Sequence, residues 1–211
     1  MGTRNLTIVV LNNTIRVAQY CQWDGYPEGQ GSTILSFLKT ANLEEFKEKV
    51  AALVEADDNY VKDLWVKCGA FPASDFVNMD VSAKFEKDYP QFHRNTGADI
   101  LSMIAKAKPG FAVRLDTEFA ADSLFCEFAY VVDLDNSTLE FYAGFNEKPL
   151  TSEERFFFLQ KEGGDRGYYP VKLVSTYSLN ALPEWQQLDA DLNPEANAEG
   201  AQESALRTAD I

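Results

Sequence analysis

Cysteine and histidine are scarce in this chain. Its 211 residues include three cysteines, Cys21, Cys68 and Cys126, and one histidine, His93. The cysteines are odd in number, form no Cys-x-x-Cys pair and stand among apolar neighbours, so we expect buried free thiols in a reducing compartment. A lone histidine lacks the second histidine or the paired cysteines of a zinc pattern. We therefore expect no metal site and no cofactor, and the sequence assigns no catalytic residue.

Long apolar runs and an excess of positive charge are also missing. No stretch approaches the roughly 18 apolar residues of a membrane span, and the run from Ile8 to Leu11 is too short for the core of a secretion signal. The formal net charge of −14, from 33 acidic and 19 basic residues, repels phosphate backbones and anionic lipids. We expect a cytoplasmic protein that binds neither a membrane nor nucleic acid directly. An acidic protein-interaction or DNA-mimic module stays open.

The chain does have enough apolar material for one domain. Hydrophobic residues make up 45% of it and aromatic residues 13%, so a chain of this length can bury a core without disulfides or metal. Residues 184–211 differ, because they carry seven acidic residues and one basic residue. We predict a single α+β domain over residues 1–183, then a short helix near Leu182–Leu188 and an acidic, disordered tail.

The N-terminal part has the pattern of a β-hairpin followed by helices. Strands over Leu6–Leu11 and Thr14–Tyr20 flank Asn12 and Asn13, which tolerate the left-handed backbone of a tight turn. Apolar residues at helical spacing and polar caps then predict a helical block. Its signals are Ser32 as the cap of a helix to Thr40, the capping pairs Asn42–Glu45 and Thr96–Asp99, the apolar set Val61, Leu64, Trp65 and Cys68, and Val81 with Phe85 before Pro90.

The C-terminal half is mostly β in pattern. A hairpin, a helical block and further hairpins indicate an α+β fold with a mainly antiparallel sheet and helices packed on it. Asp116 and Glu118 would share one strand face, where carboxylates can hold Mg²⁺ or act as acid and base; a solvated face is the alternative. Phe157 would lie against a helix layer or a partner subunit, which leaves a homo-oligomer open. The expected strands cover residues 112–118, 125–134, 139–145, 155–160 and 171–177.

The loop that spans residues 22–31 is the most unusual segment. Its two aromatic residues could stack on a flat ring, and its glycines precede a helix whose free amides and dipole would favour an anion by about 0.3–1 kcal/mol. We therefore hypothesise a site for a small anionic or nucleotide-like ligand. The alternative is a tight turn whose aromatic side chains pack inward. The candidate ligand-binding residues of this segment are Trp23, Asp24, Tyr26, Gly29, Gly31 and Ser32.

Arginines elsewhere in the chain could complete such a site. Arg4, Arg94 and Arg166 are candidates for neutralising an anionic ligand if the fold brings them together. The alternative is that they pair with the abundant carboxylates on the surface. The sequence does not decide between these arrangements, because the three residues lie far apart along the chain.

Several motifs resemble a family of uncharacterised proteins from bacteria, their phages and fungi. At the N-terminus these are Gly2-Thr3-Arg4, Val17-Ala18-Gln19-Tyr20 and Gln22-Trp23-Asp24-Gly25-Tyr26-Pro27-Glu28-Gly29-Gln30-Gly31. Further matches lie in residues 96–101, 126–135, 139–146 and 169–173. The resemblance covers nearly the whole chain up to the acidic tail. It implies one domain and a shared Trp23 loop but names no activity; a phage-borne member would suggest counter-defence or sensing.

A looser resemblance is to N-terminal nucleophile hydrolases, which begin with a hairpin whose first residue attacks an amide. Thr3, the first strand pair and Asp24 come in a similar order, which implies amide hydrolysis by Thr3. That chemistry requires Thr3 at a free N-terminus, whereas removal of Met1 would expose Gly2. Three hypotheses therefore stand: a small-ligand-binding protein, an amide hydrolase, and an acidic interaction or DNA-mimic module.

Overall fold

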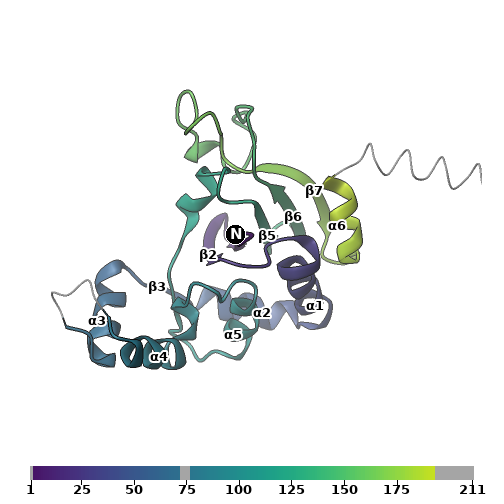
Figure 1. Ribbon diagram of the computed structural model, residues 1–211. Coiled ribbons are helices and arrows are strands. Elements are labelled where there is room, and N and C mark those ends of the chain that lie inside the picture. Colours follow the sequence, from purple (N-terminus) through teal and green to yellow (C-terminus); the bar gives the residue numbers. More distant parts are fainter. Residues whose placement is uncertain (1, 72–76, 193–211) are drawn as a thin grey trace, which may run out of the picture.

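A five-stranded sheet forms the centre of the fold (Figure 1). The structure, a computed structural model, describes residues 2–71 and 77–192. Its sheet has the strand order β2-β1-β5-β6-β7, and all neighbours are antiparallel except β1 and β5, which are parallel. This arrangement confirms the predicted α+β fold with a mainly antiparallel sheet. The strands are β1 (Asn5–Leu11), β2 (Thr14–Cys21), β5 (Phe128–Asp133), β6 (Thr138–Ala143) and β7 (Lys172–Ser178).

The first hairpin closes with the tight turn that its sequence predicts. Asn12 and Asn13 have φ values of 56° and 54°, as in a type I′ turn. The carboxylate of Asp135, in the turn between β5 and β6, accepts hydrogen bonds from the Asn12 and Asn13 amides at 2.9 and 2.8 Å. These bonds tie the two hairpins together at one end of the sheet. Every residue of β1 is buried.

Each face of the sheet has its own core because side chains alternate along a strand. Val9 packs with Ile34 and Ile100 beneath the helices. Ile8 and Phe156 belong to the core on the opposite face, which short 3₁₀ helices cover. The covering elements are α1 (Ser32–Thr40), α2 (Leu43–Ala51), α5 (Asp99–Lys106) and α6 (Trp185–Leu192) on the first face, and η3 (Thr117–Ala121) and η4 (Phe157–Leu159) on the second.

Two further helices, α3 (Asp58–Cys68) and α4 (Met79–Asp88), form an arm that extends away from the sheet (Figure 1). The arm has a small core of its own, in which the Trp65 ring stacks on Phe85 with centroids 3.7 Å apart. A short parallel pair, β3 (Val54–Glu55) with β4 (Ala112–Val113), lies beside its base. The arm is therefore packed mainly on itself.

Capping side chains were predicted correctly at one helix and wrongly at two. Asn42 accepts a hydrogen bond from the Glu45 amide and caps α2, as expected. The Thr96–Asp99 pair does not cap α5, because the Thr96 hydroxyl donates to the Pro90 carbonyl at 2.5 Å instead. Ser32 does not cap α1 either, since a π-helical turn, η1 (Pro27–Gly31), runs directly into it.

Two predicted strands are largely absent from the structure. Residues 112–118 form a strand only at β4 and then turn into η3, so Asp116 and Glu118 do not share a strand face. Residues 155–160 contain η4 rather than a strand. In this turn Phe156 is fully buried against the sheet, whereas Phe158 is 64% exposed. An apolar run indicates burial, but here only Phe156 and Leu159 of the run are buried, and Phe157 and Phe158 are exposed.

The predicted C-terminal helix is present, but it begins at Trp185 instead of Leu182 and ends at Leu192 instead of Leu188. It is α6, in which Leu188 is fully buried. The predicted acidic tail beyond residue 192 lies outside the described residues. Among residues 2–71 and 77–192, no helix is both long enough and apolar enough to cross a lipid bilayer.

Candidate functional site

The candidate site lies at the end of the sheet where β1 begins and β2 stops. Arg4 immediately precedes β1, and Gln22 and Trp23 immediately follow β2. The Gln22 amide donates a hydrogen bond to the Arg94 carbonyl at 3.1 Å, which attaches the segment before α5 to the same end of the sheet. Arg4, Trp23 and Arg94 therefore reach one region from three parts of the chain.

The loop of residues 22–31, called the corner from here on, is held by bonds from several elements. The buried Tyr130 hydroxyl donates to the Gly25 carbonyl at 2.8 Å, and the Gly25 amide donates to the Thr3 carbonyl at 2.9 Å. The Gln30 side-chain oxygen accepts a hydrogen bond from the Ala98 amide at 2.7 Å. These contacts join the corner to β5, to the segment before β1 and to the start of α5, so its shape is determined by the whole fold.

Free amides at the first turn of α1 were an expectation that the structure corrects. The Gly29 amide donates to the Tyr26 carbonyl at 3.0 Å, and the Gln30 amide donates to the Asp24 carbonyl at 2.8 Å. The Ser32 hydroxyl donates to the Glu28 carbonyl at 2.5 Å. Because the helical run starts at Pro27 instead of Ser32, these groups are already used within the corner, and the site must be built from its side chains.

Close packing explains the glycines of the corner. A Cβ atom on Gly29 would lie 2.1 Å from the Asp24 carbonyl oxygen, whereas one on Gly31 would lie 3.2 Å from the Tyr130 hydroxyl. A Cβ on Gly2 would lie 2.6 Å from a ring carbon of Trp23. Gly2 thus packs on the indole, so the first and the third N-terminal motifs of the resemblance, those of Gly2 and of Trp23, are in contact.

The different distances at Gly29 and Gly31 predict different stabilities for their alanine variants. Both glycines lie in helical backbone, so helix propensity changes equally. We expect Gly29→Ala to lower the free energy of unfolding by about 1–3 kcal/mol, since backbone must shift, and Gly31→Ala to lower it by less than about 1 kcal/mol. Urea unfolding of both variants measures the difference. Equal losses would mean that the corner is less rigid than its contacts indicate.

The aromatic side chains of the corner do not form part of the core. Trp23 is 46% exposed and Tyr26 is 40% exposed. The Tyr26 hydroxyl donates to the Asp24 carboxylate at 3.2 Å, and Asp24 has a φ of 57°. The tight turn holds both rings at the surface, in contrast to the alternative that they pack inward.

Arg4 and Arg94 both border the end of the strand that carries Tyr20, since Arg4 precedes Asn5, the partner of Cys21, and the Arg94 carbonyl accepts a hydrogen bond from the Gln22 amide. Burial raises the pKa of Tyr20, and the charges of Arg4 and Arg94 act in the opposite direction. The Tyr20 hydroxyl donates to the Gln22 side chain at 2.7 Å. Within the described ranges, neither guanidinium takes part in an ion pair, and the buried Arg4 Nε has no hydrogen-bond partner. The expected pairing with carboxylates is therefore not seen at these two arginines.

The other side chains singled out in the sequence lie in less reactive surroundings. Burial raises the pKa of the Cys21 and Cys126 thiols, which disfavours the nucleophilic thiolate. His93 Nε2 lies 3.3 Å from Glu86 Oε1 on α4. Thr3 is half-buried. Over the described parts of the chain, no group of three or more His, Cys, Asp or Glu side chains is arranged to hold a metal ion.

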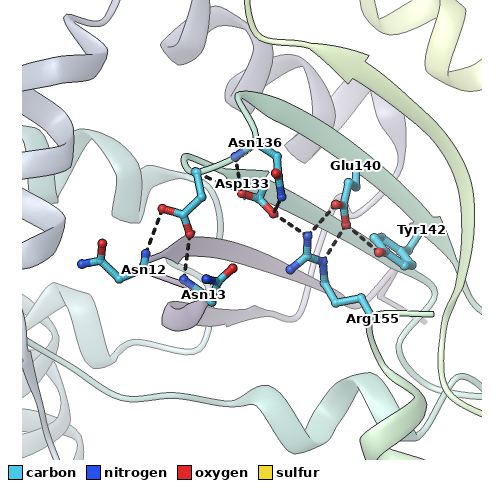
Figure 2. Close-up of polar contacts among 8 residues, drawn as sticks. Asn12, Asn13, Asp133, Asn136, Glu140, Tyr142 and Arg155 are labelled. Atoms are coloured by element: carbon cyan, nitrogen blue, oxygen red, sulfur yellow. Dashed lines mark hydrogen bonds and ion pairs between the residues drawn. The ribbon is translucent and has the colours of Figure 1, made fainter. Parts of the chain in front are cut away.

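A second polar cluster, which the sequence did not reveal, lies on the face of the sheet away from the helices (Figure 2). The Arg155 guanidinium donates to Asp133 at 2.6 Å and to both Glu140 oxygens at 2.6 and 2.7 Å. The Tyr142 hydroxyl donates to Glu140 at 2.6 Å, and the Asn136 side chain donates to Asp133 at 3.0 Å. Since these strong donors and acceptors satisfy one another, we interpret the cluster as a structural link between the sheet and the segment that carries Arg155.

Comparisons with known proteins do not identify the chain. No protein-family model, no curated protein and no solved structure matches it. The resemblance to the family of uncharacterised bacterial, phage and fungal proteins therefore stays a prediction. Function has to be argued from the side chains of the site.

Proposed function

We propose that the protein binds a small anionic, nucleotide-like ligand at the corner. The observation that carries the proposal is the meeting of Arg4 and Arg94 where the first hairpin ends: Arg4 precedes Asn5, which pairs with Cys21, and the Arg94 carbonyl accepts the Gln22 amide at 3.1 Å, beside the half-exposed Trp23. Guanidinium groups are well suited to phosphate and carboxylate. The indole supplies a flat apolar surface for a ring of the ligand.

The charge of the rest of the protein supports this location. The chain has a net charge of −14, and yet neither Arg4 nor Arg94 forms an ion pair with a carboxylate of the described residues. Leaving the Arg4 Nε buried and without a hydrogen bond costs free energy. An anionic group bound to the terminal nitrogens of Arg4 would supply the counter-charge that none of the described carboxylates supplies as an ion pair. The arrangement therefore favours a bound anion.

Removal of either guanidinium should weaken binding of AMP and ADP. A hydrogen bond to a charged group contributes about 1.5–3 kcal/mol, so we expect Arg4→Met and Arg94→Met each to raise the Kd at least tenfold. Lys47→Met is the control: it removes the same charge from α2, where Lys47 pairs with Glu44 at the surface, and it should leave the Kd unchanged. Isothermal titration calorimetry and thermal shift measure these values.

Trp23→Ala tests the stacking part of the site. Stacking of a base on an aromatic ring contributes about 1–3 kcal/mol, so nucleotides should lose affinity in this variant, whereas inorganic phosphate should not. Circular dichroism checks that the variants are folded. If neither nucleotides nor phosphate shift the melting temperature of the wild-type protein, or if the two arginine variants bind like Lys47→Met, the proposal is wrong.

A further inference from the structure

A tight turn brings a third arginine to the same region. Asp165 and Tyr168 exchange backbone hydrogen bonds of 2.7 and 2.9 Å around Arg166 and Gly167, whose φ values are 54° and 86°. Type I′ turns prefer Asn, Asp or Gly at the first of these positions, because a left-handed backbone strains larger residues. An arginine held there stores strain, which is found most often where a side chain serves a function.

Arg166 and Arg4 share one aromatic ring. The guanidinium carbon of Arg4 lies 4.4 Å from the centroid of Phe125, and that of Arg166 lies 5.4 Å from it. The two cationic carbons are thus no more than about 10 Å apart, since both lie within cation–π range of one ring. Like Arg4, Arg166 forms no ion pair with any residue that the structure describes.

The acidic surroundings favour an anion that contacts two arginines over one that contacts a single arginine. Asp122 and Glu127 act on the pKa of Cys126 in the direction opposite to Arg4, so all three charges lie near this thiol. The Glu127 carboxylate accepts a hydrogen bond from the backbone amide of Arg4 at 3.3 Å. These carboxylates repel every anionic group of a ligand, so each group needs a guanidinium of its own to bind here, and Arg166 adds a second guanidinium beside Arg4.

We propose that Arg4 and Arg166 form a second anion subsite on Phe125, adjacent to the subsite of Arg4 and Arg94. The ligand then carries two linked anionic groups, as a diphosphate does, and Arg4 lies between them. This inference rests on the proposed function and adds the chemical class of the ligand. It also gives the strained position of Arg166 a role, since the turn holds its guanidinium over the Phe125 ring.

The test compares AMP, ADP, phosphate and pyrophosphate by calorimetry on the full chain at fixed ionic strength. The wild-type protein should bind ADP at least tenfold more tightly than AMP, and pyrophosphate more tightly than phosphate. Arg166→Asn should abolish this preference by weakening ADP binding much more than AMP binding. Because asparagine suits the turn, the variant should melt no lower than the wild type.

The possible results separate this inference from the proposed function. If AMP binding depends on Arg4 and Arg94 but ADP binds no better, or if Arg166→Asn keeps the preference for ADP, the second subsite is wrong and the proposed function stands. A variant that melts lower and loses AMP and ADP affinity equally would show that Arg166 only shapes the turn, which also overturns the subsite. If none of the four compounds binds, both proposals fail.

Discussion

Arg155→Met should lower the free energy of unfolding by about 3–5 kcal/mol at neutral pH. The substitution removes the only cation in a cluster where the Asp133 side chain is 2% exposed and the Glu140 side chain is 13% exposed. Breaking a buried ion pair by deleting one partner leaves an uncompensated charge in a low-dielectric region. Urea unfolding measures the loss.

The matched control is Arg114→Met. Arg114 pairs with Asp116 at 2.8 Å, a similar distance, but its side chain is 51% exposed. Pairs of this kind contribute about 0–1 kcal/mol. Equal losses in the two variants would mean that the Arg155 cluster stabilises the protein no more than an exposed ion pair does.

The effect of Arg155→Met should also depend on pH. Burial by itself would raise the pKa of Asp133, but hydrogen bonds from Asn136 and Arg155 outweigh it, and the net pKa lies below the usual value. A folded pKa below the unfolded value of about 4 stabilises the protein at neutral pH, and this contribution is lost as the pH falls through the folded pKa. The difference between wild type and variant should therefore shrink in acid. A difference that stays constant from pH 7 to pH 3 would contradict the assignment.

Phe85→Ala should unfold the helical arm without unfolding the sheet. Phe85 is 2% exposed and contacts Trp65 of α3, together with Tyr89 and Phe92 just after α4. Truncation of a buried phenylalanine costs about 3–5 kcal/mol, and the arm has a core separate from those on the sheet. Since α3 and α4 pack mainly on each other, the loss should be local.

Hydrogen exchange followed by mass spectrometry distinguishes local from global loss. Amides in α3 and α4 should exchange faster in Phe85→Ala, while those in β1 and β5 keep their protection. Phe158→Ala is the control, because this ring is 64% exposed and its removal should change little. If β1 and β5 lose protection together with the arm, the chain unfolds as one cooperative unit.

Local patterns predicted the elements whose stability is local. The Asn12-Asn13 turn and the Asn42 cap depend on residues within a few positions of one another, and both were predicted correctly. Residues 155–160 were predicted as a strand and are not, because their conformation depends on Phe156 packing on a distant sheet. The parallel pairing of β1 with β5 has no local signal either, since its partners lie more than 100 residues apart.

The candidate site shows the same division. Trp23, Arg4 and Arg94 could be named from residue type and position alone, but the fold is what brings Arg4 and Arg94 to the end of the strand before Trp23. The role of Phe125 under Arg4 was not predicted, because its sequence context is that of a buried strand residue. The prediction of free amides at Ser32 was wrong because the helical run already starts at Pro27. Proline is common at the first position of a helix.

The parallel contact between β1 and β5 has a consequence for how the chain folds during synthesis. The first hairpin leaves the ribosome early, but one edge of β1 has no partner until residues 128–133 follow. Such long-range pairing gives a high contact order and slow folding. For that interval an apolar strand presents an unpaired edge, a common start of aggregation. Nascent chains should therefore depend on chaperones until translation has passed β5.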